Sequence, residues 1–307
     1  MGSFIARITA AARSDGGDDG LGVRALKAFD AVGGAVELDA VTGPLRRVVQ
    51  GLPLGPLRGV LQGRPLGHPL HPALVHLPLG AWLSAAVLDC VPGSERAARV
   101  LVATGVVAVA PTALTGWVDW AEQHEQQMRT GLLHVASIAA AAGLYGASWA
   151  ARAQGRDGLG RALGFAGLAA AGSGAAVGGH LAFRQATGAN KAEPVPRLVE
   201  PGWHTLGRAE EFGVGEAARR MIGEVPVLVV REAESLFHVL ADRCSHASGP
   251  LSQGKVADGC VTCPWHGSVF RLSDGWNVDG PATAPQPRFA TRTDAGGDLQ
   301  ARLPDAG

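Results

Sequence analysis

The chain has 307 residues, of which 47% are hydrophobic and 18% are charged, and its formal net charge at pH 7 is zero. That length is enough for two domains. The balanced charge, with no basic stripe and few aromatic residues, argues against a nucleic-acid partner. Four cysteines are too few for a disulfide framework in a chain of this size, so we expect a reducing compartment.

The first 50 residues carry no assigned function or fold. They lack the long apolar core of a secretory signal, which argues against cleavage and export. The stretch LGVRALKAFDAVGG, residues 21–34, is compatible with a helix.

Four apolar stretches follow in the first two thirds of the chain, at 72–88, 100–118, 131–151 and 162–183. None contains Lys, Arg, Asp or Glu, and all but the first reach the roughly 20 residues that cross a bilayer core. A soluble bundle of buried helices is the alternative, but four charge-free runs in succession are hard to place in one water-soluble core. The sequence therefore predicts an all-α transmembrane four-helix bundle over residues 51–188, with lipid as its surroundings.

Histidines gather at one end of these predicted spans. With four spans, both chain ends and the second loop lie on one membrane face, and the histidines at or near this face are His68, His71, His76, His124, His134 and His180. Polar groups in lipid are costly and often functional, although each histidine taken alone can be a structural residue. His134 and His180 come from neighbouring helices at similar depth, which makes them the better candidates for axial ligands of a haem b. A quinone or a proton relay would use the same set, His68, His71, His76, His134 and His180.

After the last span, the composition changes twice. Residues 189–202 are rich in proline and charge, which is typical of a short, semi-extended linker. From residue 203 onward the chain consists of short β-type runs, and SVFRL and WNV flank the turn Ser273-Asp274-Gly275, a hairpin signal. We expect a small antiparallel all-β domain over residues 203–307.

Two short motifs in this domain carry metal-binding residues. Cys244-x-His246 and Cys263-x-x-His266 are sixteen residues apart, and each contributes one thiol and one imidazole. A Cys2His2 zinc site is one interpretation, but zinc ribbons usually pair two C-x-x-C motifs. In a 2Fe-2S cluster of mixed ligation one iron takes two cysteines and the other takes two histidines, which matches this spacing better.

The two motifs also resemble a known family. RCSHASGPL and CPWHGSVF are similar to the two cluster loops of the Rieske family, and GPATAPQP is similar to the proline-containing segment that covers the cluster there. The resemblance implies that Cys244 and Cys263 bind the buried iron, while His246 and His266 bind the outer iron. It places three further residues around the cluster: Gly267, Ser268 and Pro285.

This sequence departs from the Rieske proteins of cytochrome bc complexes at three positions. Gly249 and Trp265 stand where those proteins carry the two cysteines of a disulfide, and Phe270 stands where they place a Tyr hydroxyl. Fewer hydrogen-bond donors to the cluster sulfurs stabilise the reduced form less, so we expect a potential in the lower half of the roughly −150 to +300 mV Rieske range.

The membrane half resembles an uncharacterised bacterial family of four-helix membrane proteins with a GHPLHP signature, residues 67–72 here. Together the two resemblances imply a membrane-anchored electron-transfer protein that exchanges electrons with a quinone, a haem or an unknown redox partner. The alternatives are a redox-sensing or structural membrane module, and an electron donor to a separate oxygenase. A stand-alone oxygenase is not expected, because only five residues follow Arg302. Without an export signal, the β domain is expected on the cytoplasmic face of the cell membrane; the sequence does not predict an oligomeric state.

Overall fold

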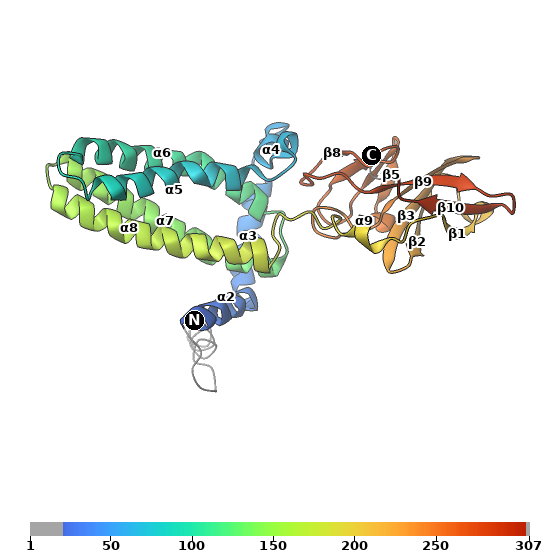
Figure 1. Cartoon of the computed structure of the whole chain (residues 1–307), viewed down its shortest axis with the longest axis horizontal. Helices are drawn as coiled ribbons and strands as arrows, with labels where there is room; N and C mark the ends of the chain where they lie inside the picture. The colour runs from blue at the N-terminus through green and yellow to red at the C-terminus, as the bar shows by residue number, and fades with distance from the viewer. Residues whose placement is uncertain (1–20, 305–307) are drawn as a thin grey trace. The chain divides into compact units, whose positions relative to one another are not determined.

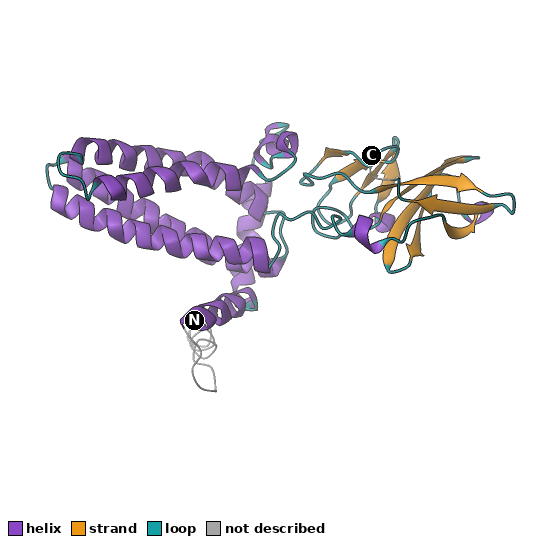
Figure 2. Cartoon of the chain, viewed as in Figure 1, coloured by secondary structure: helices purple, strands orange, loops and turns teal. Residues whose placement is uncertain are grey.

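The computed structural model describes residues 21–304, which fold into two compact units. The first unit contains Leu70–Thr187 and the described residues up to Gly55, and it is helical. The second contains Pro56–Pro69 and the described residues from Gly188 onward, and all ten strands of the described chain lie in it (Figure 2). An α-helical half followed by an all-β half confirms the predicted fold class.

Four long helices run side by side in the first unit (Figure 1). They are α5 (Leu70–Leu88), α6 (Glu95–Trp120), α7 (Glu125–Ala153) and α8 (Asp157–Gly179), and α8 continues through a π-turn, η3 (His180–Arg184). By length and composition, all four are able to cross a membrane, as predicted. Each helix extends past its charge-free run into polar flanks, because a helix satisfies its own backbone hydrogen bonds wherever it lies.

The bundle interior is formed by small residues around one aromatic pair. Trp82 of α5 and Tyr145 of α7 stack with ring centres 4.1 Å apart and planes 10° from parallel. Beyond them, Arg152 makes a two-pronged ion pair with Asp89, at 2.7 and 2.6 Å, and both side chains are buried. Buried charges of this kind are stable in apolar surroundings only when they are paired.

Short helices precede the bundle: α2 (Leu21–Gly33), η1 (Val36–Leu38), and α3 (Asp39–Gln50). The helix expected within residues 21–34 is therefore confirmed as α2. Ion pairs fix both longer helices to the bundle, since Arg184 binds Asp30 of α2 and Arg129 binds Asp39 of α3.

The second unit contains two antiparallel sheets. Their strands are β1 (His204–Arg208), β2 (Ala217–Ile222), β3 (Val225–Ala233), β4 (Leu236–Ala241), β5 (Lys255–Ala257), β6 (Cys260–Thr262), β7 (Val269–Arg271), β8 (Asn277–Asp279), β9 (Arg288–Thr293) and β10 (Asp298–Arg302). Six strands pair in the order β1-β10-β9-β4-β3-β2 and four in the order β5-β6-β7-β8. The predicted hairpin is the β7–β8 pair, and Gly275 adopts the positive φ of 75° that its turn requires.

Residues 189–202, expected as a semi-extended linker, are part of the β unit. Ala192, Val195 and Val199 are buried, and the two valines join the core of the larger sheet. The prolines do not keep this segment extended: Pro194 and Pro196 stand at the start of a helical turn, α9 (Val195–Leu198), where proline is well tolerated.

The segment Pro56–Pro69 also belongs to the β unit, although it precedes the first span. It contains α4 (Leu57–Leu61) and η2 (Arg64–Leu66). The Arg64 guanidinium donates hydrogen bonds to the Val278 carbonyl at 3.0 Å and to the Asp279 carboxylate at 2.7 Å. The residues that lead into the first span thus bind strand β8.

Candidate metal centre

Two loops with the same backbone geometry carry the four predicted ligands. In the first loop the Cys244 N–H donates to the Gly249 carbonyl at 2.9 Å, and the Ser248 N–H donates to the Cys244 carbonyl at 2.8 Å. In the second loop, between β6 and β7, the Cys263 N–H donates to the Ser268 carbonyl at 2.8 Å, and the Gly267 N–H donates to the Cys263 carbonyl at 3.1 Å. The loops are therefore equivalent, with bonds at the same offsets from each cysteine.

The residue four positions after each cysteine has a left-handed backbone conformation. Gly267 has a φ of 72°, and the equivalent Ser248 has a φ of 64°. Both lie in the left-handed region, which costs a residue with a Cβ roughly 1–2 kcal/mol and costs glycine almost nothing. The second loop has the glycine that this turn favours, while the first carries a strained serine.

The two cysteines form a buried thiol pair. Cys244 is 1% exposed and Cys263 is 3% exposed, and both belong to the core that includes Phe270 and Leu240. The Cys244 thiol donates a hydrogen bond to the Cys263 sulfur, which lowers the pKa of Cys263 to about 6; the N–H groups of Trp265 and His266 add to this effect, and burial opposes it. The same hydrogen bond, together with burial, raises the pKa of Cys244. The site therefore favours a thiolate, the form that binds metal.

The two histidines meet at the outer side of this pair. The His246 and His266 ring centres are 5.1 Å apart with planes at 90°, and both side chains are partly exposed. With a metal–nitrogen bond of about 2.0–2.1 Å and roughly 1 Å from each nitrogen to its ring centre, two imidazoles on adjacent tetrahedral positions of one ion have centres about 5 Å apart. Two buried sulfurs and two outer imidazoles fit the donor set of a Rieske-type 2Fe-2S cluster.

Neighbouring residues hold the first loop in place. Gln286, which is 2% exposed, accepts a hydrogen bond from the Ser245 N–H at 2.8 Å, and its amide donates to the Ala241 and Arg243 carbonyls at 2.7 and 2.9 Å. The Lys191 N–H donates to the Ser245 carbonyl at 2.9 Å. The backbone N–H and carbonyl of Ser245, which lies between Cys244 and His246, are therefore both hydrogen-bonded.

The predicted surrounding residues occupy different environments. Ser268 is fully buried, and its hydroxyl oxygen accepts the Ala282 N–H at 3.1 Å, which connects the second loop to the proline-containing segment. Pro285 in that segment is exposed. Gly280 lies so close to the second loop that a Cβ there would be 2.6 Å from the Gly267 carbonyl oxygen.

Gly249 and Trp265 are neighbours in space. A Cβ on Gly249 would lie 3.1 Å from the Trp265 ring and 2.7 Å from the Cys263 sulfur. The two positions that form a disulfide in the resembling cytochrome bc proteins are therefore adjacent here also. Trp265 fills this place with an indole that is 49% exposed, beside the outer histidines.

Over residues 21–304, no three His, Cys, Asp or Glu side chains converge on a point that would hold a single metal ion. Each iron of a mixed-ligand 2Fe-2S cluster takes only two protein ligands, so the two pairs described above meet its requirement.

The structure separates the membrane histidines that the sequence grouped together. His71 and His134 meet, with ring centres 6.3 Å apart, whereas His180 contacts Asp30 at 3.4 Å and the Phe29 ring. His68 and His76 bond to nearby carbonyls, those of Pro69 and Ala73. His124 caps the start of α7.

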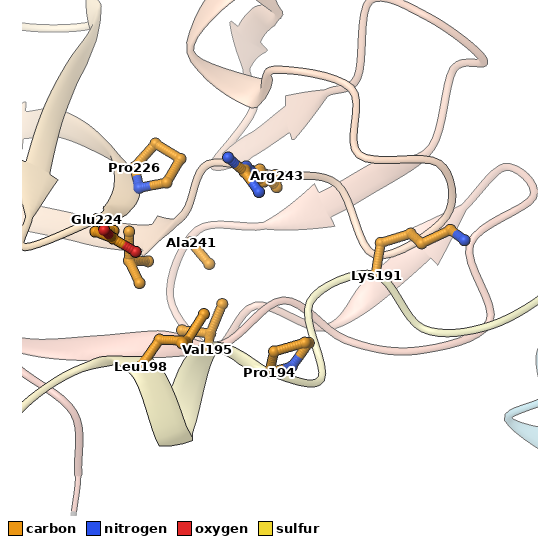
Figure 3. A pocket seen from close by; sticks show the side chains of 9 residues that line it. Lys191, Pro194, Val195, Leu198, Glu224, Pro226, Ala241 and Arg243 are labelled. Carbon is orange, nitrogen blue, oxygen red and sulfur yellow. The ribbon is translucent and has the colours of Figure 1, made fainter. Parts of the chain in front are cut away.

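A shallow pocket of about 70 Å³ lies beside the first loop, between α9 and the ends of β3 and β4 (Figure 3). Lys191, Glu224 and Arg243 are its charged lining residues, and burial lowers the pKa of Lys191. Organic cofactors need roughly 300 Å³ or more, so a pocket of this size has room for water and not for a cofactor.

Two features of this centre were not predictable from the sequence. Gln286 was not singled out, because a glutamine among prolines gives no signal until the fold places it against the first loop. The equivalence of the two loops was not evident, because the left-handed residue four positions after each cysteine is Ser248 in one loop and Gly267 in the other.

The comparisons with known proteins agree with this geometry. Residues 202–290 match the Rieske [2Fe-2S] domain, and residues 67–191 match a predicted membrane protein family, DUF2231. The chain is 41% identical over 83 residues to the anthranilate 1,2-dioxygenase ferredoxin subunit of Burkholderia cepacia, covering 27% of this chain and 76% of that protein. It is 36% identical over 93 residues to the 3-phenylpropionate/cinnamic acid dioxygenase ferredoxin subunit of Escherichia coli K12, covering 30% of this chain and 85% of that protein.

Among solved structures, the ferredoxin of carbazole 1,9a-dioxygenase from Nocardioides aromaticivorans IC177 matches with 21% identity and a TM-score of 0.31, covering 33% of this chain and 98% of that chain. The C-terminal domain is homologous to ferredoxin subunits of dioxygenases, and such a domain implies a 2Fe-2S cluster. The four apolar helices and the matched membrane family indicate a multi-pass membrane protein. The chain therefore belongs to the Rieske [2Fe-2S] family and joins that domain to a DUF2231 membrane domain.

Proposed function

We propose that this protein is a membrane-anchored one-electron carrier that works at the membrane surface. The observation that carries the proposal is the pairing of two buried cysteines with two partly exposed histidines, on a domain homologous to dioxygenase ferredoxin subunits and continuous with four apolar helices. When bound, the cluster supplies a centre that gains and loses one electron. To carry electrons, the protein needs only to bind the cluster, hold it in place and expose one edge of it to a partner.

The chain's own residues would fulfil those requirements as follows. Cys244 and Cys263 hold the inner iron within the core, and His246 and His266 hold the outer iron where a partner can approach. Gln286 and the Lys191 backbone fix the first loop, and the Ala282–Ser268 bond fixes the second. Rigid loops limit the rearrangement that accompanies a change in charge, which favours rapid electron exchange.

Two electron donors suit this architecture, a membrane quinol and a reductase at the membrane surface. To test carrier function, the detergent-purified full chain is mixed with decylubiquinol, or with NADH and a flavin reductase, and reduction of cytochrome c is followed. We expect many turnovers per cluster with at least one donor, and none in His246→Ala. A cluster that dithionite reduces, but that supports no turnover with either donor, would contradict carrier function and favour a redox sensor.

Electron delivery to a separate oxygenase is the second candidate, since both named relatives are ferredoxin subunits of dioxygenases. Turnover with the flavin reductase and not with decylubiquinol would favour this candidate over quinol oxidation. A purified Rieske oxygenase and its substrate are then added, and consumption of the substrate would support electron delivery to an oxygenase.

We further propose that the β domain faces the cytoplasm, on the basis of the four candidate spans and of the free cysteines in the described chain, which favour a reducing compartment. A cysteine introduced at the exposed Ala295, in a Cys90→Ser background, tests the side. We expect a membrane-impermeant maleimide to label it only after cells are broken. Labelling in intact cells would place the domain outside.

A further inference from the structure

The bundle consists of two helical hairpins with the same pattern. Three pairs of contacting residues join α5, and the residue directly after it, to α7. In each pair the partners are 63 positions apart: His71 and His134, Trp82 and Tyr145, and Asp89 and Arg152. The local sequences agree as well, since Leu-His-x-Ala occurs at 70–73 in α5 and at 133–136 in α7, and Gly80 corresponds to Gly143. A constant offset means that α5 and α7 run parallel, each meeting its own equivalent position across the bundle centre.

The second helices of the two hairpins follow the same rule at an offset of 62. Gly105 of α6 lies against the Trp82 ring, and its equivalent Gly167 of α8 lies against the Tyr145 ring. Gly116 and its equivalent Gly178 lie against the rings of His71 and His134, where added Cβ atoms would be 2.8 and 3.4 Å from the nearest ring atom. The bundle therefore has an approximate twofold relation, and the two histidines face each other across it.

Equivalent hydrogen bonds fix the proton on each ring. His71 Nδ1 is 2.9 Å from the Thr112 carbonyl oxygen, and His134 Nδ1 is 2.8 Å from the oxygen of the equivalent Gly174. A carbonyl oxygen can only accept, so Nδ1 carries the proton in both rings and Nε2 retains a lone pair. Histidines that bind metals characteristically donate the other ring N–H to a carbonyl or carboxylate in this way.

The separation of the two rings matches ligation on opposite sides of one metal. With a metal–nitrogen bond of about 2.0–2.1 Å and roughly 1 Å from nitrogen to ring centre, two trans imidazoles have centres about 6 Å apart. The His71 and His134 ring centres are 6.3 Å apart with planes at 84°. By the same measure, the 5.1 Å between His246 and His266 corresponds to adjacent positions of a tetrahedral ion.

We infer that His71 and His134 are the two imidazole ligands of a transition-metal centre inside the membrane bundle, either a haem iron or a free metal ion. Neither His76 nor His180 has an equivalent histidine in the other hairpin, since Ala139 corresponds to His76 and Val118 to His180. His76 is exposed, and His180 bonds to Asp30. The ligand pair thus differs from the pairing of His134 with His180 that helix adjacency favoured.

The experiment compares four full-length proteins in detergent: the wild type, His71→Ala, His134→Ala, and His76→Ala as the matched control. Each is analysed for haem and for metals beyond the cluster iron, and then titrated separately with haemin and with Ni²⁺, an ion that suits imidazole. We expect one equivalent of a probe to bind to the wild type and to His76→Ala. Each ligand substitution should weaken that binding at least about 100-fold, more than the loss of an outer hydrogen-bond partner costs.

The two probes separate the possible sources of the metal. A low-spin haem spectrum with a sharp reduced band identifies haem iron, whereas Ni²⁺ binding without haemin binding identifies a free ion. If the alanine variants fail to insert, His71→Gln and His134→Gln keep the side-chain volume close and remove the ligand nitrogen.

Absence of both probes from the wild type overturns the inference, as does binding that survives both substitutions or that depends on His180. The Rieske EPR signal, recorded on every sample, reports the other domain. A missing signal there tests the proposed electron carrier, while a missing probe at the bundle tests only the histidine pair.

Discussion

The cluster loops and the helical hairpins both bring two histidines together by using two equivalent halves, but they do so by different means. In the loops, irregular backbone is specified residue by residue, with Cys, His and a left-handed turn at set offsets. In the hairpins, regular helices are brought together by small residues, and the pairs arise only once the two helices are in register. The loop arrangement is thus encoded locally, whereas the contacts between the helices depend on a repeat more than sixty residues long.

The largest effect should come from removing a loop ligand. Cys263→Ser should abolish the cluster, because the buried Cys244–Cys263 pair then supplies only one thiolate to the inner iron. We expect two irons and two acid-labile sulfides per chain in the wild type and none in the variant, while the helix content from the bundle remains. Cys260→Ser, a substitution of the same kind in β6, should keep the cluster. Cluster loss in Cys260→Ser as well would mean that the ligand assignment is incomplete.

The next largest effect should come from breaking the buried Asp89–Arg152 ion pair. Arg152→Ala removes both hydrogen bonds to the buried Asp89 and leaves only Arg161, 4.0 Å away, as its counter-charge, which should cost about 3 kcal/mol of unfolding free energy. Glu95→Ala is the control, since it breaks the Glu95–Arg161 pair, whose side chains are 37% and 38% exposed, and leaves Arg161 beside Asp89; surface pairs are worth about 0–1 kcal/mol. Unfolding in mixed detergent micelles measures both. Equal costs for the two variants would show that the 63-residue pairing does not stabilise the bundle.

Within the β domain, Gln286→Ala should be costly although Gln286 is not among the proposed ligands. It removes one acceptor and two donor bonds from buried backbone groups of the first loop, each worth about 1–3 kcal/mol when left unsatisfied, so we expect roughly 3 kcal/mol in total. Denaturant unfolding of the cluster-loaded protein checks this value. Gln300→Ala removes two long amide N–H bonds, of 3.3 and 3.4 Å, and an exposed 2.8 Å bond that its oxygen accepts from Arg292, so it should cost less than about 1 kcal/mol.

The two loops allow a reciprocal test of their equivalence. Gly267→Ala places a Cβ in open space at a φ of 72°, so its expected cost of about 1–2 kcal/mol arises from backbone conformation alone. Ser248→Gly relieves the same strain in the other loop and should stabilise it by up to about 1 kcal/mol. Thermal unfolding curves distinguish the opposite signs. A destabilising Ser248→Gly would indicate that the serine side chain, and not the backbone, matters at that position.

The same contrast, between local loop motifs and distant helical contacts, explains which features could be predicted from the sequence. The hairpin after Phe270 was predictable, and the ligands proposed here, Cys244, His246, Cys263 and His266, were chosen from residue type and spacing, on which loop chemistry depends. The four spans were readable from composition alone. The His71–His134 pair was not, because helix adjacency says nothing about which residues meet across a bundle, and the repeat that contains the answer is degenerate apart from a few Leu, His, Ala and Gly positions.

At residues 189–202, expected to be an extended linker, tertiary packing outweighed the local sequence signal. Pro194 and Pro196 favoured an extended chain on composition, but Val195 and Val199 lie four positions apart and occupy one face of a helical turn against the larger sheet. Burial of these apolar side chains outweighed the tendency of proline to keep the chain extended. Conformational tendencies of single residues do not include such burial.

The smallest effect should come from acid, at the polar contacts of the N-terminal helices. The Arg184 guanidinium donates two hydrogen bonds to Asp30, at 3.0 and 2.6 Å, and so lowers the pKa of that carboxyl below its usual 3.8, although burial opposes the effect. A lowered carboxyl pKa contributes stability that is present above pH 3.8 and is lost as the pH falls through the folded-state value. Because Asp30 and Arg184 are 40% and 55% exposed, the contribution should be below about 1 kcal/mol.

Hydrogen exchange of α2 amides measures this contribution directly. Between pH 6 and pH 3, after correction for intrinsic exchange, protection of Leu21–Gly33 should fall in the wild type by no more than about fivefold, the equivalent of 1 kcal/mol. Asp30→Asn should be less protected at pH 6 and nearly independent of pH over this range, because its side chain does not titrate. His180 also faces Asp30, at 3.4 Å, so His180→Gln serves as the second control. If Asp30→Asn keeps the wild-type pH dependence, the acid response arises elsewhere, and Asp39 with Arg129 is the next pair to test.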